Sequence, residues 1–548
     1  MKLLWQETKW FLQQKIYIFA LALTAACGYG FAIIHPSIGI DDTAMELYLQ
    51  DGLVVEMGRW VMYLLNKVFY FAEFAPFVTE LLGVFFLMMA AVLYCVLMRR
   101  ILGERAGIVI CTVFSCLFVS NPIISRVYIY YFHNGTGIGH IFTALALLCY
   151  HRATEKQGRD RLYSLSGSMV CIWVAAGCYE SFLILYILGI LLVIFLQGVF
   201  GGVKLRTSYV LGNLAAGAGL VIGSMLLRTM ILALVIAVFR INAPDTVLGL
   251  RSLTEMFVLF RGQEGFAEFV MLVKRFWVVY HVNAFVYLPV TGYELACFCI
   301  GIYAVAAAVR HRNLWYPILF AGMLVTPFLL TVAEAKLTFY RSCQYLPFFT
   351  AVGVMVLYLA FEGRKVSRYW RSGVTFLGIV LVYNQASMLN QDFYTDYREY
   401  ELARETLTGI VYDVEREFGG NVPVVFTGEY EYPYEFMKNY YVSYDSWQYK
   451  CIAAITDLVD VHLKEKYFQP EGYCFIGESN LPMIRWGFDA FDGTNRELIH
   501  FLEMHGHSLT TITDREELER AREYGDTLPG WPEEGSIVMR DGYVLVNL

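Results

Sequence analysis

The chain has 548 residues, of which 57% are hydrophobic and 17% are charged, and its mean hydropathy is +0.49. Soluble globular domains carry about 45–50% apolar and about 25% charged residues, so the composition favours a polytopic membrane protein over a soluble or a disordered one. The net charge of −7 excludes a nucleic-acid-binding protein with a strongly basic composition. Twelve cysteines in a chain of this length exclude a disulfide scaffold.

Charge is divided unequally along the chain. Residues 391–548 contain 30 Asp and Glu against 13 Lys and Arg, a balance of −17, whereas residues 1–390 contain 19 against 29, a balance of +10. We therefore expect two domains that join near residue 390. Domain 1–390 is expected to lie in a membrane, and domain 391–548 is expected to be exposed to water.

Eleven apolar segments of the first domain are candidate membrane spans, since a helix needs about 20 mostly apolar residues to cross a bilayer. The first also resembles a signal peptide up to Cys27, but its continuation to Ile34 favours an uncleaved span. The seventh contains Arg228. The segments are 16–34, 77–98, 106–121, 137–150, 162–178, 181–199, 208–238, 293–309, 314–332, 345–361 and 373–390.

Basic residues in the loops predict the orientation. With the N-terminus in the cytoplasm, every basic cluster of a short loop falls on the cytoplasmic side, including Lys2–Lys15, Arg99–Arg105, Arg152–Arg161 and Arg364–Arg371. Cytoplasmic loops of membrane proteins are enriched in Lys and Arg. An odd number of spans then places the C-terminal domain on the outer side of the membrane.

Two outer loops, 35–76 and 239–292, are long, amphipathic and rich in aromatic residues. We expect them to lie in the membrane interface and to cover a cavity at the outer leaflet. The first loop contains Asp41 and Asp42 soon after the first span. Ionised groups at a membrane surface are costly unless they are paired or functional. A helix N-cap, for which Asp is favoured, is an equally weighted interpretation from composition alone.

Further polar residues are predicted at the same outer ends of the spans. His133 follows the third span, Glu180 lies in the turn between the fifth and the sixth, and Lys336 and Arg341 follow the ninth. Each of them alone is typical of a solvated loop. Because several converge on the side that holds the paired acids, we expect a polar site at the outer leaflet.

The residue types of this site suit glycosyl transfer. A carboxylate can act as general base toward a sugar hydroxyl, and Arg and Lys can hold a leaving phosphate. Nucleotide sugars are not expected outside a bacterial membrane, so the donor would be a polyprenyl-phosphate-linked sugar. Paired acids are also a minimal ligand set for a divalent cation. The sequence is therefore consistent either with no cofactor or with one divalent cation.

Several short motifs follow one another along nearly the whole chain. They are Asp41-Asp42, Gly58-Arg59-Trp60, Tyr179-Glu180-Ser181, Tyr383-Asn384-Gln385, Phe393-Tyr394 with Asp396, Trp531-Pro532, Gly535-Ser536-Ile537 and Asp541-Gly542. In this order and on this side of the membrane, they resemble the type II glucosyltransferases of bacteria and phages that modify O-antigen. Members of that family often have Gln where this chain has Glu180.

The resemblance implies a C-type glycosyltransferase fold, in which a helical membrane body has its active site in the outer loops. It implies that Asp41 or Asp42 is the catalytic base. We expect Arg341 to meet the donor phosphate, with Lys336 or Arg59 as second choices. Glu180 is given no part in the mechanism because it departs from the family's Gln. The candidate substrate-binding residues are Arg59, His133, Glu180, Lys336 and Arg341.

Residues 391–548 are predicted to form an α/β domain. Asp514 with Glu517 predicts a capping box, and Asp541-Gly542 between two apolar runs predicts a hairpin. Helices are expected over 392–418, 495–505 and 514–524, and strands over 422–427, 473–476, 536–539 and 543–547.

The sequence thus predicts a polytopic α-helical membrane protein of about 11 spans, similar to C-type glycosyltransferases, with a C-terminal soluble α/β domain. We expect it in the bacterial cytoplasmic membrane, moving a hexose, glucose by resemblance, from polyprenyl phosphate to a surface glycan such as O-antigen. The expected partners are this donor, the glycan acceptor and the lipid bilayer, and no nucleic acid. The alternative is a flippase or transporter of lipid-linked sugars, but the internal repeats typical of transporters are not found.

Overall fold

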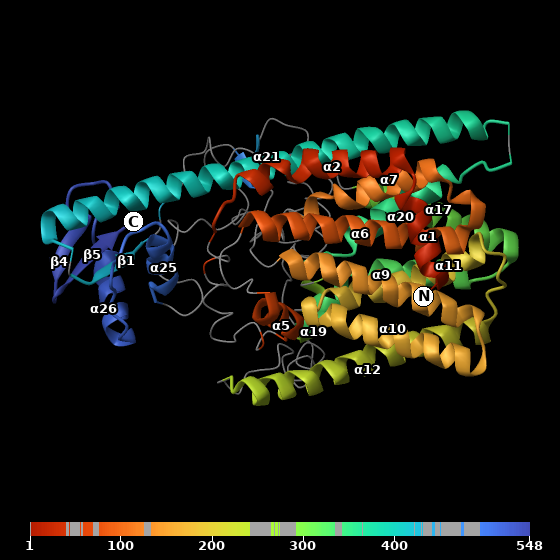
Figure 1. Ribbon diagram of the computed structural model, residues 1–548, viewed down its shortest axis with the longest axis horizontal. Coiled ribbons are helices and arrows are strands. Elements are labelled where there is room, and N and C mark those ends of the chain that lie inside the picture. Colours follow the sequence, from red (N-terminus) through yellow and green to blue (C-terminus); the bar gives the residue numbers. More distant parts are fainter. Residues whose placement is uncertain are drawn as a thin grey trace.

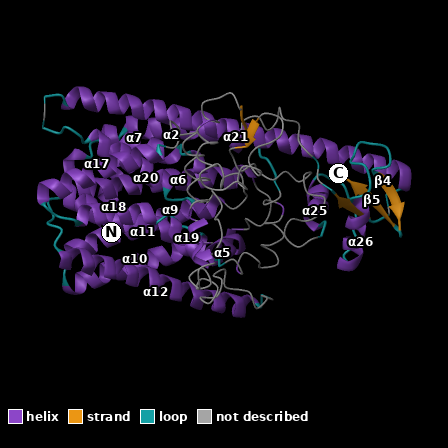
Figure 2. Ribbon diagram, turned by 180° about the vertical axis from the view of Figure 1, so that it is seen from behind, coloured by secondary structure: helices purple, strands orange, loops and turns teal. Residues whose placement is uncertain are grey.

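The structure is a computed structural model of the chain. The described residues are 2–39, 43, 55, 58–69, 76–124, 133–241, 265–267, 269–271, 273, 292–334, 342–363, 365–420, 422–428, 430, 441–443, 450, 473–475 and 494–548. The molecule is elongated, with a body of roughly parallel helices at one end and a small sheet at the other (Figure 1). The reverse view shows β4 and β5 again at the end of the molecule that lies away from the helical body (Figure 2).

The helical body is built from thirteen α-helices of the described residues and from the first part of a fourteenth, α21 (Ser367–Phe418). Each of the eleven predicted spans overlaps one of these helices, except that 314–332 is divided between two. The thirteen are α1 (Lys2–Leu12), α2 (Lys15–Ile34), α5 (Trp60–Phe69), α6 (Pro76–Leu102), α7 (Ile108–Val119), α9 (His133–Glu155), α10 (Gly158–Cys178), α11 (Phe182–Val199), α12 (Thr207–Phe239), α17 (Tyr293–His311), α18 (Trp315–Val325), α19 (Phe328–Glu334) and α20 (Leu346–Tyr358).

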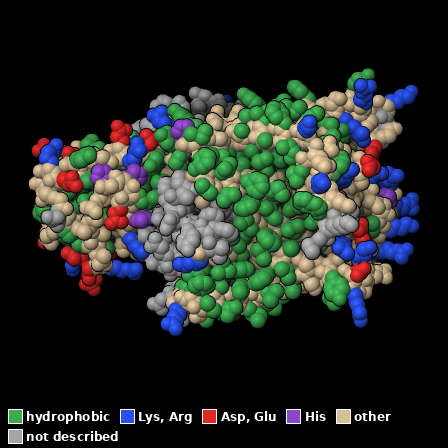
Figure 3. Space-filling view, viewed as in Figure 1, with side chains coloured by type: hydrophobic (Ala, Val, Ile, Leu, Met, Phe, Trp, Pro, Cys, Tyr) green, Lys and Arg blue, Asp and Glu red, His purple; other side chains and the backbone are tan. Residues whose placement is uncertain are grey.

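Six helices among the described residues are long and apolar enough to cross a membrane, namely α2, α6, α11, α12, α17 and α21. Helices α7, α18 and α20 are apolar but shorter. Hydrophobic side chains form a broad band across the face of the helical body that Figure 3 shows. These features indicate a membrane protein, and the count of eleven spans stays a prediction.

Lys and Arg side chains gather at the end of the helical body that lies farther from the strands (Figure 3). We call this the basic end. It includes the last turn of α6, the first turn of α10, the last turn of α17 and the first turns of α21. Because α10 starts at the basic end, the turn that joins α10 to α11 lies at the opposite end of the bundle.

Helix α21 connects the two parts of the molecule. It has 52 residues, which corresponds to a length of about 78 Å at about 1.5 Å per residue. Its first part packs against α2 and α7, and its last part packs in the C-terminal core through residues such as Leu407 and Ile410. The domain boundary predicted near residue 390 therefore falls inside one continuous helix.

The C-terminal part contains a three-stranded sheet in the order β1-β5-β4. Strand β1 (Val424–Thr427) is parallel to β5 (Tyr543–Asn547), and β4 (Ile537–Arg540) is antiparallel to β5. Alternate residues point to opposite faces of a strand. One face packs against α21 and α25 (Arg496–Met504), and the other packs against α26 (Arg515–Gly525). Strands β2 (Tyr441–Ser443) and β3 (Tyr473–Phe475) pair separately.

Two local predictions for this part are confirmed. The Asp514 carboxylate accepts a hydrogen bond from the backbone N–H of Glu517 at 2.9 Å, which caps α26. Asp541 and Gly542 have φ angles of 48° and 91°, and positive φ at both central residues is the requirement of a tight hairpin between β4 and β5.

Candidate active site

The start of α5 is held against α12. Gly58 has a φ of +79°, and the guanidinium group of Arg228 occupies the space that a Cβ at this position would need. Arg228 Nε donates a hydrogen bond to the Gly58 carbonyl oxygen at 3.2 Å. A residue with a side chain would therefore be strained and would displace Arg228, so Gly58 allows a buried arginine of α12 to fix the beginning of α5.

Trp60 holds α5 against α10. Its ring stacks on that of Trp173, with 4.8 Å between the ring centroids and 30° between the planes. Gly177 lies directly beside the Trp60 ring, and any side chain at Gly177 would overlap it. With Gly58 and Trp60 fixed on either side, the backbone of Arg59 has little freedom, and its side chain reaches the turn between α10 and α11.

Arg59 makes two contacts in that turn. Its Nη2 lies 3.8 Å from Oε1 of Glu180, and their side chains are 10% and 29% exposed. Its guanidinium carbon lies 4.5 Å from the centroid of the Tyr179 ring, where a cation is attracted by the ring face. The Arg59 side chain is largely removed from solvent, whereas that of Glu180 is partly exposed, so solvent weakens the attraction between the two charges in part.

A second layer of polar residues lies beside this turn. The Tyr179 hydroxyl is hydrogen-bonded to that of Ser342 at 3.1 Å. Gln344 lies two residues after Ser342 in the chain, and its Oε1 accepts a hydrogen bond from Nε2 of the buried His140 at 3.0 Å. These contacts join the segment that leads into α20 to α9 and to the α10–α11 turn.

The described part of this site has more positive than negative charge. Arg59 and Arg228 are both buried, and both interact electrostatically with Glu180, the one acid of this cluster in the described part of the chain. Both guanidinium groups lie in surroundings of low dielectric constant, where charges interact more strongly than in water. Planar guanidinium groups match the geometry of phosphate oxygens, so the arrangement suits an anionic ligand such as a phosphate ester.

Of the site residues predicted from the sequence, Arg59 and Glu180 are the two whose side chains lie in the described part of the chain. Arg59 and Glu180 are 121 positions apart in the chain, and the structure brings them within 3.8 Å. His133 is the first residue of α9, and its side chain is outside the described part. Asp41, Asp42, Lys336 and Arg341 also lie outside the described residues. Within the described residues, no group of three or more His, Cys, Asp and Glu could hold a metal ion.

Arg228 and Ser342 join the site although the sequence did not assign them to it. An arginine inside a long apolar segment indicates a functional site, and Arg228 lies inside the predicted span 208–238. The contact of Ser342 with Tyr179 joins residues 163 positions apart. Nothing in a single sequence indicates which distant residues will meet in this way.

Comparison with known families identifies the class of enzyme. Residues 30–358 match the family model described as Glucosyl transferase GtrII. A protein with this match and with these apolar helices is a membrane glycosyltransferase. The chain belongs to the GtrII glucosyl transferase family, as the resemblance predicted. No curated protein and no solved structure matches the chain.

The extent of the match is informative about the site. It includes Arg59, Tyr179, Glu180, Arg228 and Ser342, and it ends at the last residue of α20. Helix α21 and the C-terminal sheet lie beyond it. The cluster around Arg59 thus belongs to the part of the chain that defines the family.

Proposed function

We propose that this glucosyltransferase takes glucose from a polyprenyl-phosphate donor and transfers it to a surface glycan such as O-antigen, on the outer face of the bacterial cytoplasmic membrane. The observation that supports this proposal best is the buried pair of arginines, Arg59 and Arg228, beside Glu180 at the end of the bundle opposite the basic end. Since basic loops favour the cytoplasm, a site at the other end faces outward.

The position of Arg228 agrees with a donor that is embedded in lipid. It lies 21 residues after the first residue of α12, which is about 32 Å along a helix that starts at the basic end. This distance is close to the thickness of the hydrocarbon core of a bilayer, about 30 Å. A phosphate bound to Arg59 and Arg228 would therefore lie near the outer lipid head groups, where a polyprenyl phosphate presents its sugar.

The proposed chemistry uses Asp41 or Asp42 as the base. The carboxylate takes the proton of an acceptor hydroxyl while that oxygen attacks the anomeric carbon of the donor. The bond from the anomeric carbon to the phosphate oxygen breaks, and polyprenyl phosphate leaves as an anion. Arg59 and Arg228 stabilise the charge that develops on it, together with Arg341, which immediately precedes Ser342 in the chain.

Glycan composition of cells that produce the chain tests this function. Wild-type chain should add glucose to the surface polysaccharide, and Asp41→Asn or Asp42→Asn should reduce the added glucose by about 100-fold or more, as expected for loss of a general base. Asp160→Asn is a matched control, because Asp160 is an exposed acid at the basic end. It should leave the added glucose unchanged.

Membrane insertion and protein level are measured in parallel by quantitative immunoblotting of the membrane fraction. Full glycan modification in both Asp41→Asn and Asp42→Asn would contradict the assignment of the base. A glycan without additional glucose in cells that produce the wild-type chain would contradict the proposed transfer itself.

A further inference from the structure

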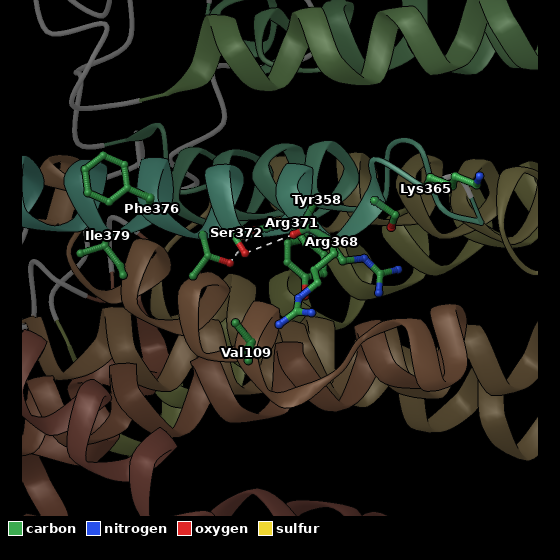
Figure 4. Close-up of a pocket in the computed structure, with 10 residues that line it drawn as sticks. Val109, Tyr358, Lys365, Arg368, Arg371, Ser372, Phe376 and Ile379 are labelled. Atoms are coloured by element: carbon green, nitrogen blue, oxygen red, sulfur yellow. Dashed lines mark hydrogen bonds between the residues drawn. The ribbon is translucent and has the colours of Figure 1, made fainter.

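A cavity of about 720 Å³ lies at the basic end, far from the cluster around Arg59. It is formed by the first turns of α21, by Tyr358 at the end of α20 and by Val109 near the start of α7 (Figure 4). The family match ends at residue 358, so most of the lining belongs to α21, outside the matched region. The cavity has no part in the proposed transfer.

The lining is cationic. Lys365, Arg368 and Arg371 are among its ten residues, and none of the ten is acidic. Figure 4 shows the side chains of Arg368 and Arg371 extending from α21 into the space between α21 and the helix that bears Val109. Three positive charges on one wall attract an anion, and arginine offers a planar pair of donors to a phosphate.

Nearby acids neutralise this charge only in part. Glu362 lies 3.3 Å from Arg371 Nη2, but it also lies 3.1 Å from Arg105 Nε, so one carboxylate serves two arginines. Arg371 Nε is shielded from solvent and has no hydrogen-bond partner in the described part of the chain. A buried donor without a partner costs free energy, and an anionic ligand in the cavity would offer it an acceptor.

The cavity continues into an apolar surface along α21. Phe376 and Ile379 line it and are 69% and 58% exposed, and Val109 opposite them is 49% exposed. Arg368, Arg371, Thr375 and Ile379 are spaced three or four residues apart, so they lie on one face of the helix. From Arg368 to Ile379 this face extends about 16 Å. The charged groups therefore lie at the start of α21 and the apolar groups lie further along the helix, in the same order as the head group and the acyl chains of a phospholipid.

We propose that this groove binds an anionic glycerophospholipid from the leaflet at the basic end. Its phosphate contacts Arg368 and Arg371, with Lys365 nearby, and its acyl chains lie along Phe376 and Ile379. Basic pockets between membrane helices are suited to anionic head groups. A soluble phosphate would use the arginines but not the apolar face, so the combination of the two favours a lipid.

Native mass spectrometry of the full chain in detergent tests this proposal. The protein is titrated with phosphatidylglycerol and with phosphatidylethanolamine of identical acyl chains. Wild type should bind phosphatidylglycerol at least about tenfold more tightly, since basic residues near the membrane surface attract anionic head groups. The double variant Arg368→Gln/Arg371→Gln should lose this preference. Millimolar glycerol 1-phosphate should not displace the lipid.

A matched control separates the groove from the general basic charge. Arg159 and Arg310 are exposed at the same basic end but do not line the cavity, so Arg159→Gln/Arg310→Gln should keep the wild-type preference. Equal binding of the two lipids by wild type would overturn the proposal without the need for any variant. The proposal would also be overturned if Arg368→Gln/Arg371→Gln kept the preference for phosphatidylglycerol, or if the control variant lost that preference equally. Displacement of the lipid by glycerol 1-phosphate would overturn it as well.

Discussion

Arg59 is the residue on which the contacts of the candidate site converge. Its guanidinium group contacts both Glu180 and the Tyr179 ring, while the residues on either side of it in the chain are fixed by α12 and α10. A side chain held in this way loses little entropy when it binds an anion, since it is already ordered.

We predict that the geometry of Arg59 is needed as well as its charge. Arg59→Gln should raise the KM for the lipid-linked donor by about tenfold or more, because a charge-assisted hydrogen bond contributes about 1.5–3 kcal/mol. Arg59→Lys keeps the charge but loses the planar pair of donors, and should recover only part of the affinity. Steady-state kinetics with varied donor concentration measure both effects.

Glu180→Gln serves as the comparison for Arg59, because the change removes the negative charge and leaves the size of the side chain unaltered. We expect donor KM within about fivefold of the wild type, because Glu180 is 29% exposed and lies 3.8 Å from Arg59, and such a salt bridge contributes about 1 kcal/mol or less. A larger effect at Glu180 than at Arg59 would contradict the assignment of Arg59 to the donor phosphate.

Local features of the helices and strands were the ones that the sequence predicted well. The Asp514 cap and the Asp541-Gly542 turn depend on residues within three positions of each other, so a short stretch of sequence is sufficient to specify them. All eleven predicted segments overlap helices, because an apolar run that favours a helix is also continuous in the sequence. Helix α9 extends beyond the predicted 137–150 at both ends, because polar residues can continue a helix after the apolar run has ended.

Features that depend on distant contacts were not predicted. The continuity of α21 through residue 390 was not expected, because the change in composition there concerns charge, whereas helix propensity continues. The pairing of Arg228 with Gly58 joins positions 170 residues apart. Such pairings follow from how whole helices pack against one another, and the residue pattern of a single sequence does not specify this packing.

The packing of α5 on α10 gives a prediction for an element. Gly177→Ala places a methyl group against the Trp60 ring, and overpacking of this kind costs about 1–3 kcal/mol. We expect a lower melting temperature in detergent and, because Arg59 adjoins Trp60, a lower transfer rate. Thermal unfolding and a transfer assay measure the two effects.

Gly167→Ala is the control on the same helix. A Cβ at Gly167 would lie 3.5 Å from the sulfur of Cys149, an ordinary contact. Alanine also has a higher helix propensity than glycine, so stability and transfer should be unchanged or slightly higher. Equal effects of the two substitutions would contradict the account of how α5 is positioned.

At the scale of the whole molecule, the distribution of charge gives a prediction of orientation. Cationic side chains gather at one end of the helical body, and strands β1, β4 and β5 with α26 lie beyond the other end (Figures 1 and 3). If the basic end faces the cytoplasm, protease added to intact spheroplasts should remove a tag at the C-terminus and leave a tag at the N-terminus intact. A C-terminal tag that is cleaved only after the membrane is broken would contradict this orientation.

The central claim is that the chain transfers glucose from a polyprenyl-phosphate donor, and its most direct test is a donor comparison with the purified chain in vesicles. Polyprenyl-phosphate [¹⁴C]glucose and UDP-[¹⁴C]glucose are supplied separately with the glycan acceptor, and radioactivity in the glycan is measured. We predict transfer from the polyprenyl donor and none from UDP-glucose. Transfer from UDP-glucose, or movement of the intact lipid-linked sugar across the vesicle membrane with no label in the glycan, would contradict the claim.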